Sequence, residues 1–213
     1  MSSLICLPKQ VVLASASPRR KELLGQMGIR FTVVPSFRKE DSPSGEASEY
    51  VCRLAGQKAR DSAGRISEDA LVIGADTAVV KNGKILGKPR NGRDAADMLQ
   101  FLQGGWHDVL TGVALIDRRL DYMDLSHACT HVEMMHLNRQ QIESYIDSGE
   151  YADKAGGYGI QGMAAAFIPR IEGCYFNVVG LPVALLYTML LRYTSCMKSQ
   201  GGVIESDHSG NNH

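Results

Sequence analysis

The residue types best suited to chemistry first gather near the N-terminus, in the motif S-A-S-P-R-R that begins at Ser15. Serine followed by proline is typical of a helix start, which places Ser17 at the N-cap and Pro18 at the first helical position. Arg19 and Arg20 then occupy the first turn, where the helix dipole disfavours each cation by roughly 0.3–1 kcal/mol. A bound phosphate would reverse this effect, since backbone N–H groups, a serine hydroxyl and two guanidinium groups can hold it. The alternative is a solvated basic turn.

A single carboxylate interrupts an apolar segment at Gly74-Ala75-Asp76-Thr77. The runs on either side, 71–75 and 78–80, have the composition of a buried strand. An unpaired aspartate is costly to bury, so Asp76 needs a cation, several hydrogen-bond donors or a metal ion. We expect Asp76 and Thr77 at a strand end beside a cleft. The alternative is an aspartate that only caps a turn.

A lysine lies on the apolar side of a predicted helix over residues 48–62. Val51 and Ala55 precede Lys58 at helical spacing. Lys58 is therefore expected to point towards the core or a cleft rather than cleanly to solvent. The alternative is a side chain that snorkels along the surface.

A second lysine and a glutamine occur in glycine-rich surroundings. Lys88 follows Gly83 and Gly87, but these glycines are too close together for a P-loop, and a proline replaces the hydroxyl residue that would hold Mg²⁺. Lys88 is still a candidate phosphate contact. Gln161 lies in the segment 155–162, where glycines let the backbone approach a ligand and the amide offers a donor and an acceptor.

Two other kinds of site are disfavoured. His127 and His131 share a strand face only if the strand extends that far back, and His136 has the opposite parity. No cysteine or carboxylate completes a recognisable zinc spacing with them. The serine motif lacks the G-x-S-x-G pattern of a nucleophile.

These side chains need a framework in which strands and helices mix. Strands are predicted over 11–14, 31–34, 71–75, 78–80, 109–116, 128–135 and 173–179, and helices over 17–28, 48–62, 94–102, 138–148 and 182–196. Asn82-Gly83 predicts a hairpin. The fold class is therefore α/β or α+β with a mixed sheet, in a single domain over residues 1–196. Residues 197–213 are polar and predict a disordered tail.

Composition narrows the class of protein. The 213 residues carry 23 Lys+Arg and 23 Asp+Glu, so the net charge of zero argues against a nucleic-acid partner but leaves room for a local anion site. Five cysteines without a C-x-x-C pair fit reduced thiols in a cytoplasmic protein. No apolar run reaches the roughly 18 residues of a membrane span, and no basic segment precedes 13–17 as a signal peptide would need.

Together the motifs resemble the Maf family of nucleotide pyrophosphatases, the septum-formation inhibitor-like proteins. The matching segments, in order, are L-A-S-A-S-P-R-R from Leu13, G-A-D-T from Gly74, L-G-K-P from Leu86, S-G-E from Ser148, D-K-A-G from Asp153, Y-G-I-Q-G from Tyr158 and V-V-G-L-P from Val178. They span about residues 11–192.

The resemblance implies an elongated, twisted mixed sheet flanked by helices, with a cleft between two lobes, as in Maf/ITPase-like proteins. It implies a hydrolase that cleaves a nucleoside triphosphate between the α and β phosphates, with Mg²⁺ or Mn²⁺, and a homodimer. The implied roles are catalysis by Asp76, phosphate binding by Ser15, Arg19, Arg20, Lys58 and Lys88, and metal binding by Glu40 and Asp76. Whether Asp76 acts as base, metal ligand or both stays open.

Three positions bear on the base. Arg19, Thr77 and Gln161 resemble the subgroup that acts on dTTP and UTP, with a link to cell-division arrest. A neutral amide can donate to O4 and accept from N3–H of uracil or thymine. The alternatives are a 7-methyl-GTP pyrophosphatase of the same fold, which typically has an aromatic residue, Gln and Glu at these positions, and a non-catalytic nucleotide-binding regulator.

Overall fold

The framework of the computed structural model, which describes residues 4–7, 9–38, 43–67 and 69–201, is one seven-stranded mixed sheet. The strand order is β2-β1-β3-β5-β6-β7, and β4 pairs with β3. The strands are β1 (Gln10–Leu13), β2 (Phe31–Val33), β3 (Ala70–Lys81), β4 (Lys84–Leu86), β5 (Gly105–Asp117), β6 (Tyr122–Met134) and β7 (Arg170–Glu172). Strands β2, β1 and β3 run parallel, whereas β3, β5, β6 and β7 are antiparallel. The predicted α/β class with a mixed sheet is confirmed.

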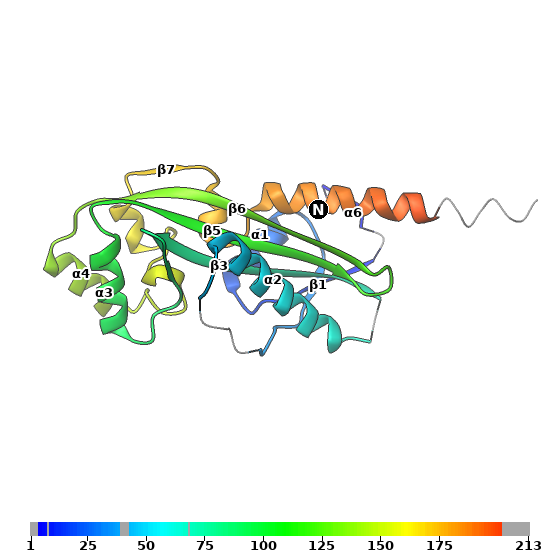
Figure 1. Cartoon of the computed structure of the whole chain (residues 1–213), viewed down its shortest axis with the longest axis horizontal. Helices are drawn as coiled ribbons and strands as arrows, with labels where there is room; N and C mark the ends of the chain where they lie inside the picture. Colours follow the sequence, from blue (N-terminus) through cyan, green and yellow to red (C-terminus); the bar gives the residue numbers. More distant parts are fainter. Residues whose placement is uncertain (1–3, 8, 39–42, 68, 202–213) are drawn as a thin grey trace, which may run out of the picture.

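The three longest strands give the molecule its elongated shape. Figure 1 shows β3, β5 and β6 running along the long axis, with one group of helices at one end and the other helices alongside the middle and the opposite end of the strands. One lobe holds β1, β2 and the helices around them, and the other holds β4, β7 and a second group of helices. Because the same strands pass through both lobes, the sheet sets how the lobes face each other.

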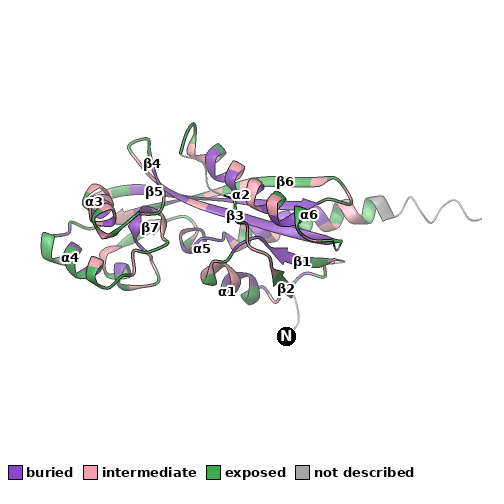
Figure 2. Cartoon of the chain, turned by 90° about the horizontal axis from the view of Figure 1, so that it is seen from below, coloured by how far each residue is buried: buried purple, intermediate pink, exposed green. Residues whose placement is uncertain are grey.

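Helices cover both faces of the sheet in the first lobe. Helix α2 (Ala47–Gly64) lies on one face, and α1 (Pro18–Gln26), α5 (Tyr175–Val179) and α6 (Val183–Gly201) lie on the other. Side chains alternate along β3, so even-numbered residues face α2 and odd-numbered residues face α1 and α6. The buried central strands are visible between these layers in Figure 2.

The second lobe packs four short helical segments against the other end of the strands. They are α3 (Gly92–Leu102), α4 (Arg139–Asp147) and the 3₁₀ turns η1 (Ala155–Gly157) and η2 (Met163–Phe167). Their core includes Val79 on β3, an odd-numbered residue, so this lobe lies on the same face as α1. The start of α4 is a capping box, as the predicted helix start at Asn138 requires.

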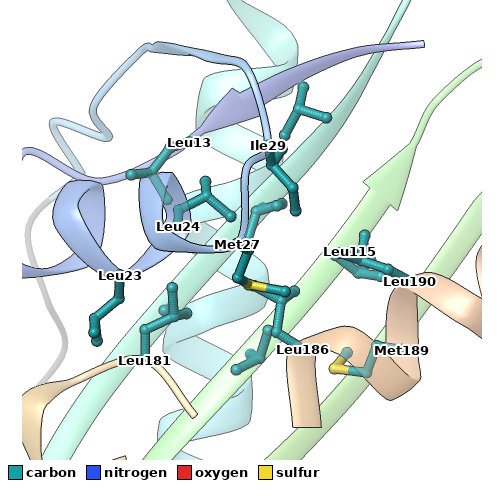
Figure 3. Close-up of a cluster of buried hydrophobic side chains, with 14 of the residues drawn as sticks. Leu13, Leu23, Leu24, Met27, Ile29, Leu115, Leu181, Leu186, Met189 and Leu190 are labelled. Carbon is teal, nitrogen blue, oxygen red and sulfur yellow. The ribbon is translucent and has the colours of Figure 1, made fainter. Parts of the chain in front are cut away.

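Helix α1 is held by the largest apolar cluster. Leu24 of α1 and Met27, which follows the helix, meet Leu186 and Leu190 of α6 above Leu115 of β5 (Figure 3). All five side chains are buried, and each such burial contributes roughly 1.5–3 kcal/mol. The arginines at the start of α1 are thereby carried on a rigid support.

The edge of β3 has a gap between two strand partners. Strand β1 pairs with β3 up to Leu13 opposite Ile73, and the pairing of β3 with β4 starts at Val79 opposite Leu86. Residues 74–78 of β3 therefore lie between the segment that pairs with β1 and the segment that pairs with β4. On the opposite edge of β3, these residues pair with β5. The expectation that Asp76 and Thr77 end a strand is wrong, because β3 continues past them to form the hairpin with β4. What ends there is the neighbouring strand, β1.

The expected strand over 173–179 is also wrong. Its β-branched and aromatic residues favour a strand, yet residues 175–179 form α5. Asn177 in this helix is fully buried and donates to the carbonyl of Val109 and the hydroxyl of Thr130. These contacts, together with Gly180 at φ 122° after the last turn, override the local preference.

The last helix is longer than expected. Helix α6 continues to Gly201, so the predicted disordered tail, 197–213, is wrong for residues 197–201. Met197 packs against the core of the first lobe, and Lys198 is favourably placed in the last turn. Residues 202–213 lie outside the described residues. Among the residues that are described, no helix is long and apolar enough to span a membrane.

Candidate active site

A cleft with a volume of about 740 Å³ opens between the two lobes, within the range of about 300–1,000 Å³ typical of small-molecule sites. It lies beside the gap in the edge of β3 and draws residues from both lobes. The predicted site residues that line it are Ser15, Arg19, Arg20, Lys58, Asp76, Thr77, Lys88 and Gln161. Glu40, the remaining predicted residue, lies outside the described residues.

Asp76 and Lys58 form an ion pair on the α2 side of β3. The Lys58 ammonium donates to Oδ1 of Asp76, and the two side chains are 15% and 8% exposed. The prediction that Lys58 points into a cleft is confirmed. The contact offsets much of the cost of burying the carboxylate, so the sheet can hold a charged oxygen ligand at the cleft floor.

Thr77 points to the opposite face, where it meets Arg20 of α1. The Arg20 guanidinium donates from Nε to the carbonyl of Gly180 (2.8 Å), from Nη2 to Oγ1 of Thr77 (3.0 Å) and from Nη1 to Oγ of Ser15 (3.3 Å). Ser15 also accepts from the backbone N–H of Ser17, which sits at the N-cap position but makes no side-chain cap itself. The planar guanidinium is thus held in one orientation beside the cleft.

A chain of buried hydrogen bonds continues behind Thr77. The hydroxyl of Thr111 donates to the backbone carbonyl of Asn177 (3.0 Å) and lies 2.9 Å from the hydroxyl of Thr77. Since the proton of Thr111 is used in this way, Thr77 donates to Thr111 and accepts from Arg20. Thr111 and Asn177 are fully buried. The position of Arg20 is therefore coupled to the packing of α5 on the sheet.

Two cations from different lobes, Arg19 and Lys154, line the cleft. Burial, and then the positive charge of Arg19, lower the pKa of Lys154. Lys154 is held by the backbone carbonyls of Glu150 and Ala152 in the second lobe. An anion bound between Arg19 and Lys154 would relieve this repulsion. The placement supports the phosphate-site interpretation over a solvated basic turn.

The glycine-rich loop beside Gln161 is fixed by Glu150. The Glu150 carboxylate accepts from the backbone N–H of Met163 at 2.9 Å. A Cβ atom at Gly162 would lie 1.9 Å from that carboxylate, so a larger residue there would displace the Glu150 side chain from this position. The neighbouring Gln161 is exposed on the cleft wall, where its amide is available to a ligand.

Four charged lining residues were missed from the sequence: Arg38, Glu150, Asp153 and Lys154. The last three lie in the matched motifs S-G-E and D-K-A-G, so their glycine-rich neighbours were an available signal. Arg38 is in a loop without a motif. The described lining residues include six Lys or Arg and three Asp or Glu, a surplus of three positive charges. The cleft is thus suited to a polyanion.

The carboxylates of the cleft fit a hard divalent cation. Mg²⁺ binds one or two carboxylates together with phosphate oxygens and waters. Asp76 is buried at the cleft floor, whereas the Glu150 carboxylate is used by the loop and Asp153 is exposed. Asp76 and the phosphates of a bound nucleotide are therefore the ligands such an ion would find among the described residues.

Sequence comparison finds a family model and relatives that match most of the chain. The model of the family described as Maf-like protein matches residues 10–193. A dTTP/UTP pyrophosphatase of Pelotomaculum thermopropionicum is 50% identical over 186 residues, covering 87% of this chain and 97% of that protein. A dTTP/UTP pyrophosphatase of Alkaliphilus metalliredigens is 45% identical over 190 residues, covering 87% and 96%. Among solved structures, the Staphylococcus aureus Ham1 protein aligns at a TM-score of 0.39 and 14% identity, covering 59% of this chain and 72% of that one.

Proposed function

Because the chain belongs to the Maf-like protein family, we propose that it is a nucleoside triphosphate pyrophosphatase that hydrolyses dTTP and UTP to the monophosphate and pyrophosphate. The observation that carries this function is the cleft itself. A buried carboxylate paired with Lys58 lies at its floor, and cations from both lobes converge above it. Relatives 45–50% identical over nearly their whole length bear the same activity in their names.

We assign the phosphate chain to the cations of the two lobes. A triphosphate carries about four negative charges at neutral pH, since its terminal phosphate has a second pKa near 6. Arg20 is pre-oriented by three hydrogen bonds, and Arg19 and Lys154 line the cleft from different lobes. Such fixed cations stabilise the charge that develops on the leaving pyrophosphate.

Asp76 acts on the attacking water. In the proposed reaction a water oxygen attacks the α-phosphorus, the bond from that phosphorus to the bridging oxygen breaks, and pyrophosphate leaves with the bonding electrons. Lys58 compensates the charge of Asp76, so that the carboxylate stays ionised at this position. Asp76 can then either take the proton of the water or hold a divalent cation. A bound Mg²⁺ or Mn²⁺ supplies charge neutralisation and activation of water.

Gln161 is proposed to read the base. Its amide can donate to O4 and accept from N3–H of uracil or thymine, whereas a glutamate lacks the donor. The hydroxyl of Thr77 is already engaged by Arg20 and Thr111, so Thr77 acts on selectivity through the position of Arg20. Arg19 supports the phosphate end.

The test measures pyrophosphate release from competing UTP, dTTP, CTP, ATP and 7-methyl-GTP. We expect the highest kcat/KM for UTP and dTTP, loss of activity in EDTA and its return with Mg²⁺ or Mn²⁺. Gln161→Glu should lower kcat/KM for UTP more than Gln161→Asn. A preference for 7-methyl-GTP would contradict the assigned substrates and indicate a pyrophosphatase of the other subgroup. Nucleotide binding without turnover would favour the non-catalytic regulator. Full activity in EDTA would exclude a role for the divalent metal ion.

Two further parts of the proposal concern the protein's surroundings. A homodimer rests on the family resemblance and is tested by light scattering on the purified chain. A cytoplasmic location rests on the unpaired cysteines and is tested by fractionation. The proposed substrate is a free nucleotide, without a nucleic-acid or membrane partner, in keeping with the net charge of zero.

A further inference from the structure

Three side chains with different ligand atoms meet on β5 and β6, outside the cleft. Asp108 lies directly opposite His131 in the register, and Cys129 precedes His131 by two residues. Because side chains alternate along a strand, all three project from one face of the sheet. Their ligand atoms lie within 4.8 Å of one another, and none of the three lines the cleft.

This placement suits a metal ion held by a sheet. Two ligands at i and i+2 on one strand, with a third directly across on the neighbour, point at a common spot above the face. Around a tetrahedral zinc ion, with bonds of about 2.0–2.3 Å, ligand atoms are roughly 3.3–3.6 Å apart. Nδ1 of His131 and Oδ1 of Asp108 are 2.5 Å apart, and both side chains are about half exposed. Small side-chain rotations open the space, with no change in the paired backbone.

We propose that Asp108, Cys129 and His131 form a binding site for a zinc-class divalent cation. A thiolate and an imidazole select Zn²⁺ over Mg²⁺ and Mn²⁺, which prefer oxygen. Binding displaces the thiol proton of Cys129 and replaces the Asp108–His131 hydrogen bond with two metal bonds. A water completes four-coordination.

The tertiary structure builds this site from residues that have no zinc spacing along the chain. Asp108 and His131 are 23 residues apart and become neighbours only through the β5–β6 pairing. Neither His127 nor His136 belongs to the cluster of described residues. The site is therefore independent of the proposed pyrophosphatase function, and either can fail without the other.

Co²⁺ is the probe, added to the reduced, purified full chain in excess Mg²⁺. We expect about one equivalent of Co²⁺ to give a thiolate-to-cobalt charge-transfer band, which Asp76 and phosphate oxygens cannot produce. Zn²⁺ should bleach the band. Cys129→Ser should abolish it, and His131→Asn or Asp108→Asn should weaken Co²⁺ binding at least tenfold.

Cys6→Ser is the matched control, because it removes another exposed thiol. It should keep the full band, and Cys129→Ser should keep wild-type pyrophosphate release with Mg²⁺, which shows that the variant is folded. No band in the wild type would overturn the proposal. A band that survives Cys129→Ser, or one that is lost in Cys6→Ser, would also overturn it.

Discussion

At the scale of single residues, the neighbours Asp76 and Thr77 of β3 make contacts on opposite faces of the sheet. Asp76 faces α2 and pairs with Lys58, and Thr77 faces α1 and orients Arg20. The alternation of a strand lets one dipeptide organise both the proposed water-activating group and the proposed phosphate-binding group. The two functions nonetheless depend on different partners, so substitutions can separate them.

Asp76→Asn keeps the shape of the side chain and removes its charge. We expect turnover of UTP to fall at least ~100-fold, as for loss of a general base or metal ligand. Steady-state pyrophosphate release measures it. Asp147→Asn, an exposed carboxylate at the end of α4, is the matched control and should stay at wild-type rate. Retention of more than about a third of the rate by Asp76→Asn would exclude the assigned role.

The two arginines should respond differently to lysine. Arg19→Ala and Arg20→Ala each remove charge-assisted contacts, which predicts a loss of about 10- to 150-fold in kcat/KM. Arg20→Lys should resemble Arg20→Ala, because one ammonium cannot reproduce the contacts with Ser15, Thr77 and Gly180. Arg19→Lys should retain most activity. Equal effects of the two lysine substitutions would contradict the orienting role of the Arg20 contacts.

At the scale of elements, α2 reaches the sheet only because two strand residues lack a Cβ. A Cβ at Gly74 would lie 2.3 Å from the carbonyl oxygen of Ala55, and one at Gly112 would lie 2.4 Å from that of Val51. Gly112 pairs directly with Asp76 in the register. The distance between α2 and β5 therefore sets how Lys58 meets Asp76.

Gly112→Ala should push α2 off the sheet by about 1 Å and lower the unfolding free energy by roughly 1–3 kcal/mol. It should also lower kcat, because Lys58 moves away from Asp76. Urea unfolding and kinetics measure the two effects. Gly64→Ala adds a Cβ at the end of the same helix with nothing within 4 Å, so both quantities should stay near wild type. A Gly112→Ala enzyme with normal kcat would separate helix packing from catalysis.

At the scale of the whole molecule, a buried carboxylate outside the site motifs stabilises the first lobe. Asp117 at the end of β5 is fully buried and accepts from Lys9 and from the hydroxyl of Tyr193 on α6, each at 2.7 Å. Burial, and then Asp117, raise the pKa of Tyr193, which therefore stays a donor. The contacts tie the N-terminal segment, the sheet and the last helix together.

Asp117→Asn should lower the unfolding free energy by roughly 2–4 kcal/mol, because a buried charge partner is lost while Lys9 keeps Asp69. Turnover at 25 °C should not change, since Asp117 does not line the cleft. Asp121→Asn is the control: Asp121 is exposed at φ 49°, which asparagine also adopts, so the change should stay within about 0.5 kcal/mol. Equal stability of the two variants would contradict the role of Asp117.

The local patterns of the sequence predict the candidate chemical groups and most of the elements. Ser-Pro-Arg-Arg predicts a helix start beside an anion, Asp76 in an apolar run predicts a paired carboxylate, and Asn82-Gly83 predicts the β3–β4 hairpin, which forms with both residues at positive φ. These features depend on backbone sterics, dipoles and the cost of burying charge, which act over a few residues.

Contacts between distant segments were decided only by the tertiary structure. Strand β3 does not end at Asp76, residues 175–179 form a helix, and Thr77 accepts a hydrogen bond from Arg20. In each case, partners 34 to 160 residues away along the chain override the local preference. The gap beside the cleft lies between Ile73, the last β3 residue paired with β1, and Val79, the first one paired with β4, a property of strand pairing that no single segment encodes. The same pairing brings Asp108 beside His131.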